Sequence, residues 1–134
     1  MGERAASVPV VRRLVGVYNA DGSAIGELIY FIGARLGRAH CALCDITHGR
    51  VRERDDWKMA KEKLAVPFET YHRDDQPAAV RAAGGALPVV VAITDERVVT
   101  ILESPDLIAC GGTPSRLLER IDDAVRRLGL QWPP

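Results

Sequence analysis

The stretch that decides the fold of this chain runs from Leu87 to Leu102 and reads LPVVVAITDERVVTIL. The run Val89–Ile93 is apolar and largely β-branched, which is typical of a buried strand. Thr94–Arg97 is a short polar segment, and the apolar pattern resumes over Val98–Leu102. Two apolar runs separated by so short a turn predict an antiparallel β-hairpin.

A helix is predicted downstream of this hairpin. Thr113 is a suitable N-cap residue, and Pro114 suits the first helical position. Apolar residues then recur with the spacing of one helix face, at Leu117, Leu118, Ile121, Ala124, Val125 and Leu128. The intervening Ser104–Gly112, which contains Cys110, is interpreted as a loop.

Two more strands are predicted upstream, over Val10–Tyr18 and Phe68–His72. We expect Val10–Tyr18 to lie beside Val89–Ile93 in the sheet. Strands joined through a helix pair in parallel, whereas the two strands of the hairpin pair antiparallel. The sequence therefore predicts an α/β fold with a central, four-stranded mixed sheet.

Helices are predicted on the flanks of this sheet. Residues 25–36 carry apolar side chains at helical spacing, at Ile25, Leu28, Ile29, Ile32 and Leu36. A second helix begins at Asp55 or Asp56 and runs through Leu64, and a short one spans Pro77–Ala83.

Length and composition favour a single domain. The chain has 134 residues, of which 47% are hydrophobic, and we assign residues 10–130 to the domain, 1–9 to an N-terminal arm and 131–134 to a tail. Basic and acidic residues number 18 each, so the formal net charge is zero and binding to nucleic acid is not expected. Neither a run of about 20 apolar residues nor a secretory signal is seen, so no membrane association and a cytoplasmic location are expected. The sequence leaves the oligomeric state open.

The segment with the most specific chemistry is Cys41-Ala42-Leu43-Cys44. Two cysteines separated by two residues can close on each other, so one can resolve a mixed disulfide that the other forms. In a reducing compartment such pairs are more often catalytic or metal-binding than structural. The nearby charges have both signs, with Arg38, Arg50, Arg52 and Arg54 against Asp45, Glu53, Asp55 and Asp56.

The same cysteines also make part of a metal site. Cys41, Cys44 and His48 have the residue types and close spacing of zinc ligands, and a fourth ligand would come from His40, His72 or Cys110. A site with only three ligands would be catalytic, or would hold Cu(I). No cofactor is required by the sequence. A third interpretation treats the cysteines as small buried hydrophobes in a non-catalytic interaction scaffold.

The order of elements resembles that of thioredoxin-fold proteins, through the Cys-x-x-Cys, Pro88 before the third strand, the hairpin and the terminal helix. The resemblance covers roughly residues 10–130 as architecture. It implies a cis Leu87–Pro88 bond, with Pro88 facing the dithiol. It also implies thiol–disulfide exchange on a protein disulfide or a small thiol. We expect Cys41 to be the more exposed, attacking thiol and Cys44 the resolving one. His40 stands where the family has Trp, and a predicted helix separates Tyr18 from Cys41.

The segment from Cys41 to Gly49, CALCDITHG, followed by Trp57, also resembles a group of small uncharacterised bacterial proteins, some of which are labelled GTPases. The chain lacks the Gly-x-x-x-x-Gly-Lys-Ser/Thr loop that would bind nucleotide phosphates, and Gly22–Gly26 has no such lysine. The sequence therefore gives no support for GTP binding.

The position of Cys110 depends on how the segment after the hairpin folds back. We expect Cys110 at the end of the sheet far from Cys41. The reason is that the last helix is expected to begin at the end of the sheet opposite the one where the preceding strand stops.

Overall fold

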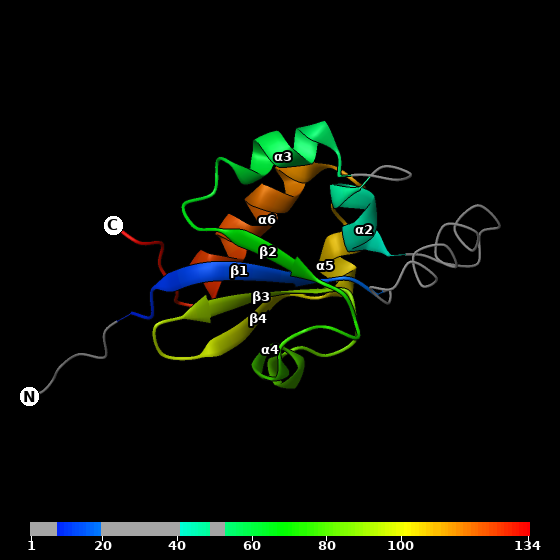
Figure 1. Cartoon of the computed structure of the whole chain (residues 1–134). Coiled ribbons are helices and arrows are strands. Elements are labelled where there is room, and N and C mark those ends of the chain that lie inside the picture. Colours follow the sequence, from blue (N-terminus) through cyan, green and yellow to red (C-terminus); the bar gives the residue numbers. More distant parts are fainter. Residues whose placement is uncertain (1–7, 20–40, 49–52) are drawn as a thin grey trace, which may run out of the picture.

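The computed structural model describes residues 8–19, 41–48 and 53–134. In chain order the elements are β1 (Val11–Val17), α2 (Ala42–Thr47), α3 (Asp55–Lys61), β2 (Phe68–Tyr71), α4 (Ala78–Ala83), β3 (Val89–Thr94), β4 (Val98–Leu102), α5 (Ser104–Ile108) and α6 (Pro114–Arg127). The helix predicted over residues 25–36 lies outside the described residues. Figure 1 shows the helices arranged around the sheet.

Within the described residues, four strands form one mixed sheet with the order β2-β1-β3-β4. β1 pairs in parallel with β2, and Leu14 is opposite Phe68. β3 pairs antiparallel with both β1 and β4. The predicted four-stranded mixed sheet is confirmed, including the hairpin and the position of Val10–Tyr18 beside the buried strand. The expected parallel direction of helix-linked strands holds for β1 and β2 but was wrong for β2 and β3, which α4 joins and which run in opposite directions because β3 is antiparallel to β1.

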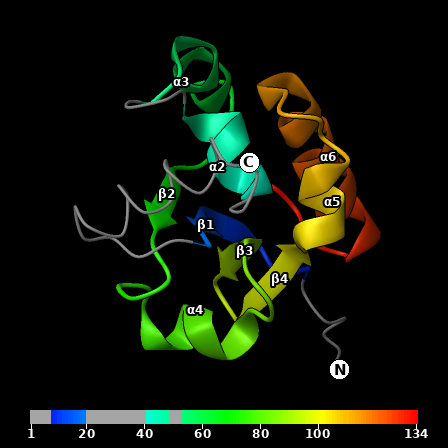
Figure 2. The same ribbon diagram turned by 90° about the vertical axis from the view of Figure 1, so that its right-hand side faces the viewer.

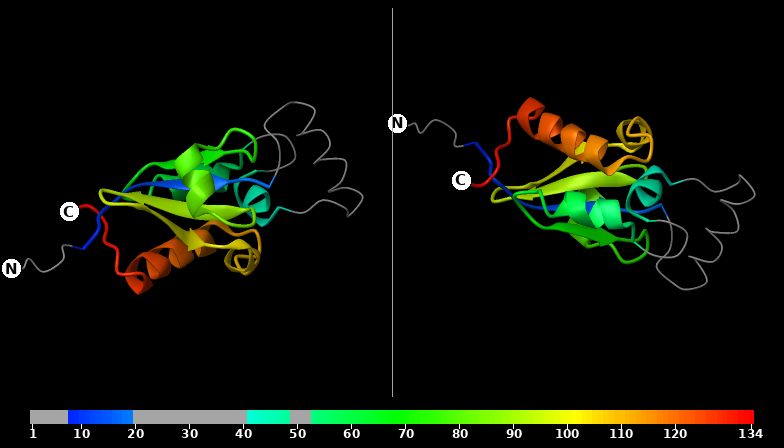
Figure 3. Two further views of the ribbon diagram at one scale, coloured as in Figure 1. Left: turned by 90° about the horizontal axis from the view of Figure 1, so that it is seen from below. Right: turned by 90° about the horizontal axis from the view of Figure 1, so that it is seen from above.

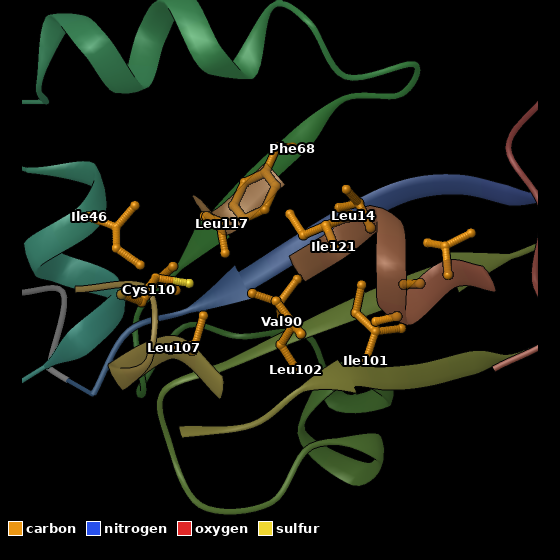
Figure 4. Close-up of a cluster of buried hydrophobic side chains, with 14 of the residues drawn as sticks. Leu14, Ile46, Phe68, Val90, Ile101, Leu102, Leu107, Cys110, Leu117 and Ile121 are labelled. Carbon is orange, nitrogen blue, oxygen red and sulfur yellow. The ribbon is translucent and has the colours of Figure 1, made fainter. Parts of the chain in front are cut away.

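The two faces of the sheet are covered unequally. α2, α3 and α6 lie over one face and α4 lies over the other, as the two perpendicular views show (Figures 1 and 2). The larger core contains Leu14 and Val90 from the sheet together with Leu117 and Ile121 from α6 (Figure 4). Trp57 of α3 belongs to the same core. The smaller core, on the α4 side, consists of Val15, Val17, Val80, Val89 and Val91.

Side-chain alternation along the central strands explains this division. In β3, Val90 and Ala92 belong to the larger core, whereas Val89 and Val91 belong to the smaller one. Successive side chains of a strand point to opposite faces. A strand that is buried on both faces needs an unbroken apolar run, and the sequence of β3 provides one.

Two short helices were not predicted: residues 42–47 form α2, and residues 104–108 form α5. The interpretation of Ser104–Gly112 as a loop was therefore wrong. Both helices are too short for a repeating apolar pattern to be visible. The N-terminus of α5 has a reciprocal capping box: the Glu103 side chain accepts from the backbone of Asp106, and the Glu103 N–H donates to the Asp106 carboxylate at 2.9 Å.

The C-terminal segment is attached to the start of β1, at the end of the sheet opposite α2 (Figure 3). The Gln131 N–H donates to the Pro9 carbonyl at 3.0 Å, and the Val11 N–H donates to the Gln131 carbonyl at 2.9 Å. The indole N–H of Trp132 donates to Asp122 of α6 at 2.9 Å. Within the described ranges, none of the helices has the length and apolar content that crossing a bilayer requires.

Candidate functional site

Cys41 and Cys44 are brought together at the start of α2. Cys41 is the N-cap residue of this helix, and Cys44 lies one turn further on. Residues three apart are neighbours on a helix surface. The two sulfurs are at disulfide distance, and the Cα atoms are 5.2 Å apart, within the usual range for a bridged pair.

The two cysteines differ in exposure, and not in the predicted sense. The Cys41 side chain is buried, with 0% exposure, and is part of the larger core. Cys44 is half-buried and packs at the margin of that core. The expectation that Cys41 is the more exposed thiol was wrong, because the start of α2 docks against the sheet rather than projecting into solvent.

The Cys41 sulfur is an acceptor for two backbone N–H groups. The Cys44 N–H donates to it at 3.3 Å, as in other N-cap interactions. The Asn19 N–H, just beyond the end of β1, donates to it at 3.5 Å. This second contact joins the start of α2 to the end of β1.

Leu43 and Ile46 hold α2 in this position. Both side chains are fully buried. Leu43 reaches the face of β1 at Gly16, where an added Cβ would lie 2.9 Å from the Leu43 side chain and 3.0 Å from Phe68. The absence of a side chain at Gly16 therefore lets the segment between the two cysteines approach the central strand.

A buried polar cluster lies at the other end of α2. The Tyr18 hydroxyl is 2.9 Å from the Thr47 hydroxyl and 3.4 Å from Nδ1 of His48, and Thr47 Oγ1 is 2.7 Å from the same nitrogen. Burial raises the pKa of Tyr18, although hydrogen bonds from Thr47 and Thr70 oppose the shift. Tyr18 and Thr47 were not among the predicted site residues, because the only signal of each in the sequence is a polar residue at the end of an apolar element.

The predicted metal ligands are arranged as follows. His48 is the C-cap of α2 and contacts Tyr18 and Thr47. His72 follows β2, where its ring lies 5.4 Å from that of Tyr18 and its Nδ1 is 3.6 Å from Asp75. His40 lies outside the described residues. Among the residues that the structure describes, no group of three or more His, Cys, Asp or Glu side chains is gathered so that it could hold a metal ion.

Pro88 precedes β3, and the predicted cis Leu87–Pro88 bond is confirmed. The next residue, Val89, is paired with Val17 near the end of β1. Because Asn19, two residues beyond Val17, contacts Cys41, Pro88 lies at the same end of the sheet as the cysteine pair.

Cys110 also lies at this end, so its predicted position at the far end was wrong. α5 packs against α2 (Figures 1 and 3), and Cys110 points into the core near Ile46 and Leu107 (Figure 4). β4 runs antiparallel to β3, as β1 does, so β4 and β1 end at the same end of the sheet. α5 follows β4 at that end, and α6 therefore begins there. The Cys110 thiol is buried, and burial raises its pKa.

Arg54 connects the segments around the cysteine pair. One guanidinium nitrogen donates to the carbonyls of Asp45, at 2.8 Å, and Gly112, at 2.7 Å. The other two nitrogens donate to the Asp56 carboxylate at 3.0 and 2.6 Å, and this hydrogen bonding lowers the pKa of Asp56. A single side chain thus joins α2, the start of α3 and the segment before α6.

Replacing Arg54 with alanine is expected to lower the free energy of unfolding by about 1–2 kcal/mol, because two carbonyls lose a charged donor. Lysine at this position cannot reproduce the forked geometry and should cause most of the same loss. Urea denaturation measures both. The control is Arg126→Ala, which removes an exposed ion pair with Asp122 and should cost no more than about 0.5 kcal/mol. Equal losses in Arg54→Ala and the control would contradict the connecting role.

Comparison with protein-family models, with curated proteins and with solved structures finds no match to this chain.

Proposed function

We propose that this protein is a thiol–disulfide oxidoreductase that uses the Cys41–Cys44 pair. The observation that carries the proposal is the geometry of the pair: the sulfurs are at disulfide distance across one turn at the start of a helix. The hydrogen bonds to the Cys41 sulfur add support, because N–H donors favour the thiolate that forms when the disulfide opens.

We further propose a thioredoxin-like fold for the domain. The parallel pairing of β1 with β2 and the antiparallel hairpin are consistent with that resemblance. Pro88 directly precedes the third strand, at the same end of the sheet as the dithiol. On this proposal Pro88 faces the dithiol and borders the place where a partner would bind.

The chemistry is a two-step exchange. The thiolate of a reduced partner attacks one sulfur of the Cys41–Cys44 disulfide, forms a mixed disulfide and releases the other sulfur as a thiolate. A second partner thiolate attacks the partner's sulfur in that mixed disulfide. The products are the reduced pair and the oxidised partner, and the reverse sequence reduces a partner disulfide. We propose a protein disulfide or a small thiol as the partner.

The proposal is tested by the reduction of insulin with dithiothreitol, measured as turbidity. The protein should accelerate this reaction at catalytic concentrations, and Cys41→Ser and Cys44→Ser should each abolish the acceleration. Cys110→Ala, which removes a buried thiol outside the pair, should retain it. The oxidoreductase proposal would be refuted if the protein does not accelerate insulin reduction and the redox state of the Cys41–Cys44 pair does not change across glutathione redox buffers.

The alternative to the redox proposal is a metal site formed by Cys41, Cys44 and His48. Metal analysis is done on protein purified without chelator or added metal. We expect no stoichiometric zinc or copper, since the two sulfurs are joined to each other and the His48 ring is hydrogen-bonded within the Tyr18 cluster. A stoichiometric metal that is lost in Cys44→Ser would replace the redox proposal. A metal-free, unreactive pair would favour an interaction scaffold.

A further inference from the structure

The two sulfurs of the pair occupy different environments. Cys41 is inside the larger core with no exposed surface, whereas Cys44 is half-buried at its margin. Exchange requires the attacking thiolate to approach a sulfur directly, so its rate depends on access to that sulfur. Of the two residues, only Cys44 has exposed surface at which an external thiolate can approach the pair.

Hydrogen bonding favours Cys41 as the leaving thiolate when the disulfide opens. Both the Asn19 and the Cys44 backbone N–H groups donate to the sulfur of Cys41. Burial alone raises the pKa of a thiol, as it does for Cys110, and two N–H donors act against this penalty. A thiolate released at Cys41 is therefore stabilised where it forms, and a better-stabilised leaving thiolate departs faster.

We infer that Cys44 is the sulfur that exchanges with the partner and that Cys41 is the leaving and resolving thiolate. This inference rests on the proposed oxidoreductase function and reverses the roles predicted from the sequence. When the oxidised protein is reduced, the partner thiolate attacks Cys44 Sγ, the Cys44–Cys41 bond breaks, and both electrons of that bond stay on Cys41. In the opposite direction, Cys44 attacks a partner disulfide and expels a partner thiolate. Cys41 then attacks Cys44 Sγ, releases the second partner thiolate and restores the Cys41–Cys44 disulfide.

The first test uses single-cysteine proteins in a Cys110→Ala background, so that each protein has one thiol. Cys41→Ser leaves Cys44, and Cys44→Ser leaves Cys41. Both are incubated with oxidised glutathione, and the mixed disulfide is quantified by intact mass. We expect Cys44 to be glutathionylated at least about tenfold faster than Cys41. Equal rates, or faster reaction of Cys41, would overturn the inference.

A second measurement uses the unmodified chain and does not depend on the folding of any variant. The fully reduced protein is treated with substoichiometric N-ethylmaleimide, and the labelled cysteine is identified by peptide mapping. Label mostly on Cys44 supports the assignment, and label mostly on Cys41 overturns it while leaving the oxidoreductase proposal intact. If neither cysteine forms a mixed disulfide with glutathione and insulin reduction is not accelerated, the proposed function itself fails.

Discussion

Replacing Trp57 with alanine is expected to lower the free energy of unfolding by about 3–5 kcal/mol, a large share of the stability of a domain this size. Trp57 is fully buried on α3, and its ring meets that of Phe68 edge-on, with centroids 4.9 Å apart. Alanine would leave a cavity between α3 and β2 and remove this aromatic pair. Thermal and urea unfolding measure the effect, with a fall in melting temperature of roughly 10–20 °C.

Trp57→Phe is the matched control. The indole N–H of Trp57 is buried, and no hydrogen-bond partner for it is found in the part of the chain that the structure describes. A buried N–H without a partner is costly, so its removal should offset part of the lost volume. We expect phenylalanine to cost no more than about 1.5 kcal/mol. A loss of stability in Trp57→Phe as large as that in Trp57→Ala would show that the indole N–H makes an essential contact.

Replacing Gly16 with valine is expected to lower the free energy of unfolding by about 1–3 kcal/mol. A side chain at this position would press on Leu43 and Phe68, since the first added carbon already lies within about 3 Å of both, as the 2.9 and 3.0 Å approaches show. Leu43 lies between the two cysteines, so the displacement would also disturb their attachment to β1. We therefore expect faster N-ethylmaleimide labelling of reduced Cys41 in Gly16→Val than in the parent protein.

Two further substitutions separate crowding from other effects of replacing a glycine. Gly16→Ala adds only the first carbon, and small shifts of the Leu43 and Phe68 side chains can accommodate it, so we expect a loss below about 1 kcal/mol. Gly85→Ala adds the same carbon where no atom lies within 4 Å and should be close to neutral. If the Gly16→Val protein is as stable as the parent protein, then the close approach of Leu43 to β1 is not what positions α2.

The elements that the sequence predicted are those whose patterns are long and local. The hairpin was visible because Val89–Ile93 and Val98–Leu102 flank a short polar turn, and α6 because its apolar residues repeat over several turns. α2 and α5, with six and five residues, are too short to show a repeat. An isolated helix of that length is marginal in water, so tertiary packing of residues such as Leu43 and Leu107 decides whether it forms.

For the candidate site, the sequence by itself determined the cysteine pair, because a spacing of two residues brings the thiols together once the chain makes a helical turn. It also determined that Pro88 directly precedes the third strand. Tertiary structure alone decided that Cys41 is buried, that Asn19 donates to its sulfur, and that Tyr18 meets Thr47 and His48. These contacts join residues 22 to 30 positions apart, so they depend on how α2 docks on the end of β1. Docking depends on the shape and volume of buried side chains, which a one-dimensional pattern of apolar residues does not specify.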